Sequence, residues 1–387
     1  MSAYSQKRIS PSGASVSPES GKQKAAIDNV AAKGVPFYTP EQDPPAGTAV
    51  KPRDGFSLPK LFSPLKSVAL CYRIASGSVR CPGSMMIEAT AVQANGRITP
   101  EDSGIWLHAH METMRKHVDF SHRQNALIGI QIAHAGRKVS TVAPWLSSGA
   151  TAEPEAHGWP DDVVGPSSEP FSDKYPMPRS MSLQEIDQLK KDFVAAAIRV
   201  VDIGFDVIEL HFAHGYLVSS FLSPAVNKRS GQYGGSFENR TRLATELVRE
   251  TPPPTCSRTK RRLAQMLAQE GVDVIDVSSG GNHPAQKVQG GPGYQAKFAK
   301  AIKQAVGDKM LVSTVGSIKS GTQAQEIIAE GQEVDLVAAG RMFQKNPGLV
   351  WAWANDLGFN IQVAHQIGWG FGGRAAKKQE HVKLSIP

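Results

Sequence analysis

Two histidines and a tyrosine stand close together in the sequence, directly after a segment that is predicted to be a β-strand. His211 and His214 are three positions apart, and Tyr216 follows two positions later. Two imidazoles at the end of a strand can bind an oxygen anion, and a phenol can donate a proton. Because an unperturbed phenol has a pKa of about 10, it donates only to a strongly basic centre such as a developing carbanion. The three residues therefore predict electrophilic and general-acid catalysis.

Two other interpretations of the same histidines stay open. A zinc site would need a third and a fourth ligand, and the motif is not the H-E-x-x-H of zinc hydrolases. The imidazoles could also do no more than hydrogen-bond to loop carbonyls. We predict no metal site, because the pattern lacks the remaining ligands.

Six short segments that are rich in β-branched residues and apolar on both faces are predicted to be buried parallel strands. They are residues 85–92, 127–133, 206–211, 272–278, 310–315 and 334–339. Amphipathic helices are predicted between them. The clearest begins at the capping box formed by Ser182 and Glu185 and ends at Gly204. This alternation predicts repeated βα units.

Polar and glycine-rich residues follow five of these strands, at 134–137, 211–216, 278–281, 316–317 and 340–341. In α/β barrels the chemistry lies on the loops that follow the strands, so these residues predict one functional rim. The long segments 139–182 and 212–240 are expected to cap that rim. The alternative, a doubly wound open sheet, would favour a G-x-G-x-x-G turn after the first strand, and the sequence has none.

The predicted barrel is incomplete, because a closed barrel needs eight strands and the first and fifth are not recognisable. No full βα unit fits between residues 61 and 85, and three prolines replace an apolar run between 249 and 263. Losing two strands would expose sheet edges. The cluster of Arg258, Lys260, Arg261 and Arg262 is interpreted as the trace of a reading-frame or splice change, rather than as a nuclear-localisation or polyanion-binding patch.

The composition restricts the class of protein. The chain has 387 residues, of which 40% are hydrophobic and 20% are charged, so a large buried core is expected. Its three cysteines, Cys71, Cys81 and Cys256, form no C-x-x-C pair, so neither a disulfide scaffold nor a cysteine-built zinc site is expected. The net charge of +8 is compatible with polyanionic small molecules and with nucleic acid alike.

No apolar run reaches the roughly 18 residues that a membrane helix needs, and the first residues lack the order of a signal peptide. Cytoplasmic localisation is therefore expected. Residues 1–55 are rich in Ser, Pro, Gly, Lys and Gln and are predicted to be a flexible arm. Residues 56–375 are predicted to form the barrel domain, and residues 376–387 a C-terminal tail.

Three segments together resemble the old yellow enzyme family of FMN-dependent NAD(P)H oxidoreductases. They are residues 131–137, 204–240 and 334–341. The likeness extends over residues 61–373 and is strongest to the thermophilic-like bacterial enzymes and their fungal relatives, because residues 280–284 and 367–371 match as well. This resemblance implies a (β/α)8 barrel that binds FMN at its carboxyl rim, with NADPH or NADH as the reductant.

The resemblance also assigns cofactor contacts. Gln131 matches the glutamine that hydrogen-bonds to the pyrimidine side of the flavin, and Ala89 matches the small residue that lets the ring lie close to the backbone. Gly316, Gly340 and Arg341 match the two strand-end turns that hold the FMN phosphate. Glycine permits close backbone approach, and arginine offers a forked, permanently charged donor.

His211 and His214 match the pair that binds the carbonyl or nitro oxygen of an activated alkene, and Tyr216 matches the phenol that protonates the α-carbon. The implied partner is a small activated alkene or enone, not nucleic acid or a membrane, and a homo-oligomer is compatible with the resemblance. The family's Ser-Pro-Met turn and Val-Arg-Ile strand are missing. The alternative is therefore an impaired or truncated relative that does not hold FMN and has at most a binding role.

Overall fold

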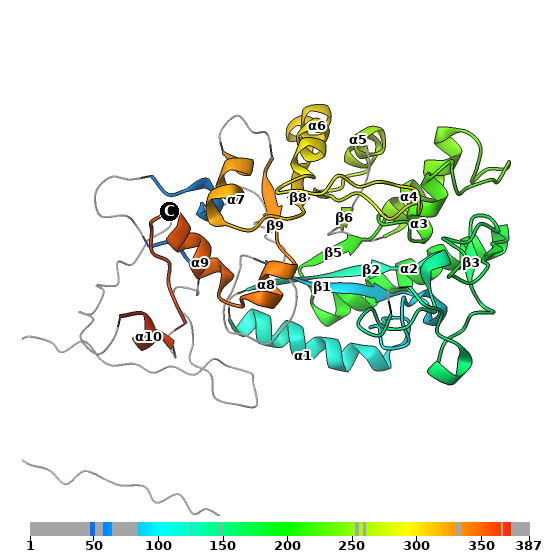
Figure 1. Cartoon of the computed structure of the whole chain (residues 1–387), viewed down its shortest axis with the longest axis horizontal. Coiled ribbons are helices and arrows are strands. Elements are labelled where there is room, and N and C mark those ends of the chain that lie inside the picture. The colour runs from blue at the N-terminus through cyan, green and yellow to red at the C-terminus, as the bar shows by residue number, and fades with distance from the viewer. Residues whose placement is uncertain are drawn as a thin grey trace, which may run out of the picture.

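The computed structural model describes residues 47–50, 57–63, 84–124, 126–147, 149–251, 255–257, 261–329, 334–364 and 367–372. Within these residues, seven parallel strands form one sheet whose spatial order is the order of the chain (Figure 1). The strands are β1 (Ser84–Ala91), β2 (Leu127–Ala133), β5 (Val207–Leu210), β6 (Thr255–Ser257), β7 (Val274–Val277), β8 (Leu311–Val315) and β9 (Leu336–Ala338). The six predicted strands are confirmed, each to within two residues.

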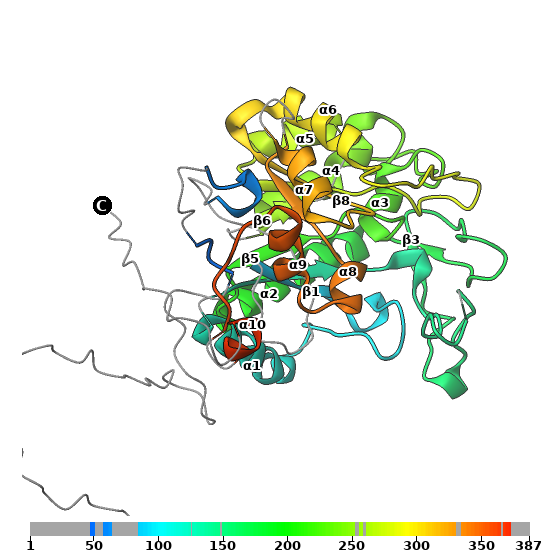
Figure 2. The same cartoon turned by 60° about the vertical axis from the view of Figure 1, so that its left-hand side comes forward.

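Helices alternate with the strands and lie on the outside of the curved sheet (Figures 1 and 2). The main ones are α1 (Ala109–Arg123), α2 (Leu183–Ile203), α4 (Phe237–Glu250), α5 (Arg261–Gln269), α6 (Ala296–Val306) and α7 (Gly321–Ile328). Shorter helices are α3 (Leu217–Leu222), α8 (Arg341–Lys345), α9 (Leu349–Asp356) and α10 (Trp369–Gly372). Turns of 3-10 helix are η1 (Lys60–Phe62), η2 (Ala94–Gly96), η3 (Gly136–Lys138), η4 (Pro154–Ala156) and η5 (Gly307–Lys309).

Helix α2 shows why the local signals in the sequence were sufficient there. The Ser182 side chain accepts a hydrogen bond from the backbone N–H of Glu185, and the Glu185 carboxylate accepts one from the N–H of Ser182. Both bonds satisfy N–H groups that the first helical turn leaves unpaired. Gly204 ends the helix at φ 101°, a conformation that glycine adopts without strain. The predicted capping box and C-terminal glycine are confirmed.

The sheet curves around its own interior. A cluster of buried side chains joins Met86 on β1, Val207 on β5, Val274 on β7, and Leu336 and Ala338 on β9. Since β1, β5, β7 and β9 are not direct neighbours in the sheet, their side chains can share one cluster only if the sheet curves around it. A second, larger cluster packs the other strand face against the helices. The described part of the chain is therefore a barrel wall with helices outside, as an α/β barrel requires.

The prediction that no strand lies between residues 249 and 263 is wrong. Strand β6 pairs with β5 on one side and β7 on the other, and α5 follows it. Three residues are too few to show a strand period, so only the hydrogen-bonding edges of the neighbours select this segment as a strand. Of the basic cluster, Arg261 and Arg262 begin α5. Arg258 and Lys260 lie outside the described residues.

The predicted gap at the first strand falls mostly on residues 64–83, which lie outside the described residues together with Cys71 and Cys81. Just before it, the Leu61 N–H donates to Gln325 Oε1 on α7 at 3.0 Å, and the rings of Phe62 and Phe359 lie 4.6 Å apart between centroids. Residue 84 begins β1, at the opposite edge of the sheet.

The predicted arm comprises residues 1–55, and the structure describes residues 47–50 of it. Ala49 pairs antiparallel with Ile361, and Gly47 and Val50 hydrogen-bond to the backbone at positions 362 and 360. This end of the arm therefore packs on the C-terminal part of the domain. The predicted tail, residues 376–387, lies outside the described residues.

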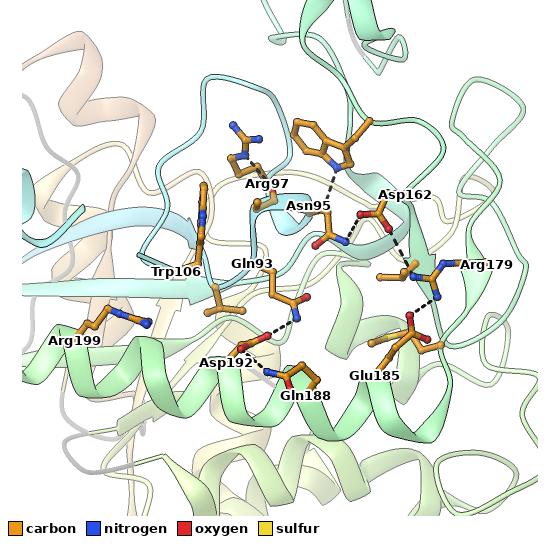
Figure 3. A pocket seen from close by; sticks show the side chains of 15 residues that line it. Gln93, Asn95, Arg97, Trp106, Asp162, Arg179, Glu185, Gln188, Asp192 and Arg199 are labelled. Atoms are coloured by element: carbon orange, nitrogen blue, oxygen red, sulfur yellow. Dashed lines mark hydrogen bonds and ion pairs between the residues drawn. The ribbon is translucent and has the colours of Figure 1, made fainter. Parts of the chain in front are cut away.

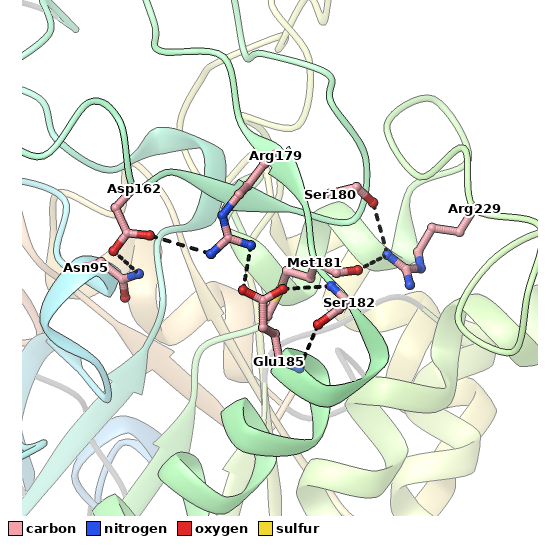
Figure 4. A network of polar contacts seen from close by, with 8 residues as sticks. All are labelled: Asn95, Asp162, Arg179, Ser180, Met181, Ser182, Glu185 and Arg229. Carbon is pink, nitrogen blue, oxygen red and sulfur yellow. Dashed lines mark hydrogen bonds and ion pairs between the residues drawn. The ribbon is translucent and has the colours of Figure 1, made fainter.

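A polar network ties the two long loops to the start of α2 (Figure 4). Arg179, on the short strand β4 (Arg179–Ser180) that pairs with β3 (Val164–Gly165), contacts Asp162 at 3.7 Å and Glu185 at 2.5 Å. From the second loop, the Arg229 guanidinium donates to Ser180 Oγ and to the carbonyl of Met181. Both loops are thereby fixed relative to the sheet.

Candidate active site

The structure brings His211, His214 and Tyr216 together at the carboxyl end of β5. His211 Nε2 lies 3.3 Å from His214 Nδ1, so two ring nitrogens face each other. The Tyr216 ring is 5.3 Å from the His211 ring and 6.5 Å from the His214 ring, between centroids. His211 is buried, and the other two are partly buried. The roles of these side chains remain predictions, but the arrangement that those roles require is present.

The loop that carries these side chains is held in a strained backbone conformation. His214 has φ 61° and Gly215 has φ 74°, and a Cβ on Gly215 would lie 2.1 Å from the carbonyl oxygen of Gly281. The Lys138 ammonium donates to the carbonyls of His214 and Gly281, which joins the loops after β2, β5 and β7. A left-handed non-glycine residue persists only where its surroundings hold it. Lys138 is one such restraint on His214.

Burial changes the acid–base behaviour of the rim. It raises the pKa of the Tyr216 phenol, and the Asp102 carboxylate adds to this shift. Tyr216 is therefore protonated but a weaker acid than an exposed tyrosine. Burial, with a smaller effect of Arg137, lowers the pKa of the Lys138 ammonium to about 8.

A polar layer lies inside the sheet below the histidines, and sequence reasoning missed it. Glu209, Asp276 and Ser313, on β5, β7 and β8, are fully buried. Glu209 Oε1 accepts a hydrogen bond from Gln131 Nε2 at 2.9 Å and lies 3.7 Å from His211 Nδ1. The available signal was an acidic residue inside each of two apolar strand segments, because buried carboxylates are rare without a partner.

Ala89 and Gln131 lie side by side. In the β1–β2 pairing Ile87 is opposite Ile130 and Thr90 is opposite Ile132, so two residues of β1, one of them Ala89, face the single residue Gln131. This β-bulge changes the direction of the β1 backbone at Ala89, where the flavin ring is predicted to lie close to the backbone. The small Ala89 side chain and the Gln131 amide fit the pyrimidine edge of a flavin.

The predicted phosphate contacts lie on adjacent strand ends. Gly316 follows β8 and Gly340 follows β9, and these strands are paired at Val315 and Ala338. Gly316 has φ 119°, and a Cβ there would lie 2.7 Å from the Tyr294 ring, so only glycine fits. Arg341, directly after Gly340, is exposed, so its guanidinium is accessible to a phosphate, as its predicted role requires. The residues present therefore fit FMN at both ends, the ring and the phosphate.

His134 and Arg137 have structural contacts. His134 is buried, its Nδ1 accepts a hydrogen bond from the Gly136 N–H at 3.0 Å, and burial lowers its pKa to about 3. The imidazole is therefore neutral. Arg137 is buried as well and donates to the backbone carbonyls of Glu169, Pro170 and Asn282. It joins the loop after β2 to a capping loop and to the loop after β7.

A cavity of about 580 Å³ lies outside the sheet, between the loop after β1 and the first turns of α2 (Figure 3). None of the predicted site residues lines it. Several of its side chains contact one another: Asp192 accepts from Gln93 and Gln188, and the Arg97 guanidinium lies 4.5 Å from the centroid of the Trp159 ring.

The metal interpretation of the histidines gains no support. The described residues contain no group of three or more His, Cys, Asp or Glu side chains that could hold a metal ion.

Among the helices that the structure describes, none is long and apolar enough to span a membrane.

Comparison with known proteins agrees with the geometry. The model of the NADH:flavin oxidoreductase / NADH oxidase family matches residues 70–252. An NADH:flavin oxidoreductase of Gibberella zeae is 43% identical, with 92% of this chain and 98% of the relative covered. NADPH dehydrogenases of Bacillus cytotoxicus and of a Geobacillus species are 39% and 38% identical, covering 73% and 75% of this chain and 81% and 84% of those enzymes.

The alignment with the Gibberella zeae relative also bears on the predicted gaps. It extends over 415 positions, which is more than the 387 residues of this chain. The relative therefore has residues for which this chain has no counterpart.

Proposed function

Because the chain belongs to the NADH:flavin oxidoreductase / NADH oxidase family, the old yellow enzymes, it is an oxidoreductase that uses FMN and NAD(P)H, and we propose that its acceptor is an activated alkene. The observation that carries this proposal is the pair of facing ring nitrogens of His211 and His214, 3.3 Å apart, with the Tyr216 ring beside them. We also propose that the reaction takes place in the cytoplasm and that the substrate is a small molecule such as an enone.

The cofactor is held in this proposal by two groups of residues. Ala89 and Gln131 line the ring, while Gly316, Gly340 and Arg341 hold the phosphate. Bound there, FMN supplies two-electron chemistry, taking hydride from the reduced nicotinamide and giving it to the acceptor. Gln131 orients the ring edge through its amide, which is itself fixed by Glu209.

His211 and His214 bind the carbonyl or nitro oxygen of the alkene. Ring N–H groups that point at one oxygen stabilise the negative charge that develops there when the β-carbon accepts hydride. The two nitrogens are already close enough to share a single acceptor. His214 is kept in place by Lys138, which holds its carbonyl.

Tyr216 supplies the proton at the α-carbon. Because burial raises the pKa of its phenol, Tyr216 carries its proton throughout the physiological pH range. The same shift makes it a poor acid toward weak bases. The proton is therefore available to a carbanion but not to an ordinary carbonyl, which favours an activated alkene as the substrate class.

The proposal is tested in three steps on the purified full-length chain. After incubation with FMN and desalting, we expect a retained flavin absorption band. Anaerobic NADPH should bleach this band, and an enone such as 2-cyclohexenone should restore it with formation of the saturated ketone. Bleaching without recovery by any enone or nitroalkene would refute the alkene-reductase function. A soluble chain that retains no FMN would instead support the alternative of an impaired relative.

A further inference from the structure

A continuous series of polar contacts runs from β2 to the loop after β7. Gln131 Nε2 donates to Glu209 Oε1 at 2.9 Å, and the same oxygen lies 3.7 Å from His211 Nδ1. His211 Nε2 lies 3.3 Å from His214 Nδ1, and His214 Nε2 lies 2.8 Å from Ser278 Oγ. The series joins the residue predicted to contact the flavin with both residues predicted to bind the substrate oxygen.

Glu209 imposes a direction on this series. Its side chain is fully buried, and its Oε1 accepts the hydrogen bond from Gln131 Nε2. When ionised, a carboxylate can only accept hydrogen bonds. The Gln131 amide must therefore turn its NH2 group toward Glu209 and its carbonyl oxygen away. At 3.7 Å the contact between the Glu209 carboxyl group and His211 Nδ1 is too long for a hydrogen bond. It still favours a proton on the nitrogen that faces the carboxylate.

The order of protons in the resting site follows from this direction. With its proton on Nδ1, a neutral His211 presents a lone pair at Nε2. The facing His214 Nδ1 must then carry the proton of the bond between the two rings. His214 Nε2 is left as an acceptor, which suits the Ser278 hydroxyl because that group can donate. Both histidines are then Nδ1–H tautomers.

This resting order does not suit an oxygen anion, because the His211 Nε2 lone pair would face it. We propose that Glu209 is ionised and is a positioning residue that sets the tautomers of both histidines and stabilises a second proton on His211, at Nε2, when an oxygen anion binds. One proton comes from solvent and adds to the Nε2 lone pair, and no other bond forms or breaks. Two N–H groups, His211 Nε2–H and His214 Nδ1–H, then converge on the oxygen. The inference rests on the proposed function, since it concerns the same site.

The test reads the histidines directly by ¹⁵N NMR of the FMN-treated, ¹⁵N-histidine-labelled full chain. The His211 signals are assigned by their loss in His211→Gln. The oxygen anion used as a probe is 4-nitrophenolate, whose own absorbance also reports its affinity. In the unaltered protein we expect His211 protonated on Nδ1 alone without the probe and on both nitrogens with it. Glu209→Gln should leave His211 singly protonated with the probe bound and weaken probe binding by about tenfold or more.

The matched control is Glu246→Gln. Glu246 accepts a hydrogen bond from the Tyr233 hydroxyl at 2.8 Å and contacts Lys190 at 3.2 Å, on the helix layer and not in the polar layer inside the sheet. The control removes the same charge, so its His211 signals and probe affinity should stay unchanged. Glu209→Asp keeps the charge but retracts it by one methylene, and should restore double protonation of His211 in part.

Measurements on the unaltered protein alone can overturn the inference, so the test does not depend on whether a variant folds. A His211 that carries one proton in the probe complex, or that carries its resting proton on Nε2, contradicts it. Equal losses of probe affinity in Glu209→Gln and Glu246→Gln would also contradict it. Failure of the proposed function has a different signature, because it appears as absent FMN retention or absent alkene reduction while the histidine signals still report the role of Glu209.

Discussion

Replacing His134 by asparagine should remove a steep pH dependence from the stability of the fold. His134 is 2% exposed, and burial lowers its pKa from 6.5 to about 3. Asparagine keeps the acceptor for the Gly136 N–H, because its Oδ1 can take the place of the imidazole Nδ1. The substitution therefore removes the titrating group while it keeps the hydrogen bond.

The sign and size of the effect follow from proton linkage. Below its ordinary pKa of 6.5 the imidazole gains a proton in the unfolded chain but stays neutral in the folded one down to about pH 3. Stability is therefore lost as the pH falls, by about 1.4 kcal/mol per pH unit once the unfolded imidazole is fully protonated. As the pH falls from 6.5 to about 4.5, His134 should lower the free energy of unfolding by about 2 kcal/mol. The asparagine variant should lack this component.

The assay is urea unfolding, followed by tryptophan fluorescence, at several pH values between these limits. The quantity of interest is the difference in unfolding free energy between the unaltered chain and His134→Asn, because constant packing costs of the substitution cancel from its pH dependence. His157→Asn is the matched control, since His157 is exposed and asparagine tolerates its φ of 60°. A difference that stays constant with pH for His134→Asn would refute the assignment of a neutral, buried imidazole.

Three further substitutions test the site. Gly316→Ala should weaken FMN retention about tenfold, because its Cβ would meet the Tyr294 ring at 2.7 Å, whereas Gly290→Ala, with open space around it, should not. Equal FMN retention in both variants would contradict the predicted role of Gly316 in holding the FMN phosphate. Tyr216→Phe should slow alkene reduction by about a hundredfold and leave reduction of FMN by NADPH unchanged in stopped-flow absorbance, and equal slowing of both steps would count against a proton-donor role. Arg341→Gln should weaken FMN binding about tenfold and make it less sensitive to salt, as measured by flavin fluorescence titration. An unchanged salt dependence would place the phosphate elsewhere.

Local patterns in the sequence were sufficient for most of the framework. Six apolar segments predicted six strands because each is long enough to show buried character on both faces. The start of α2 was predictable because Ser182 and Glu185 satisfy each other's backbone within four residues. Strand β6 was missed because its three residues have no period of their own, and pairing with β5 and β7 alone makes them a strand.

The same division applies to the site. The sequence by itself determined which side chains can do chemistry: His211, His214 and Tyr216 are near neighbours along the chain, so one strand end places them together. Only the tertiary structure decided what surrounds them. Glu209 meets Gln131 from another strand, and Lys138 reaches His214 from another loop. Such contacts depend on the register and curvature of the whole sheet, and no local period records them, so they could be found only once the strands were side by side.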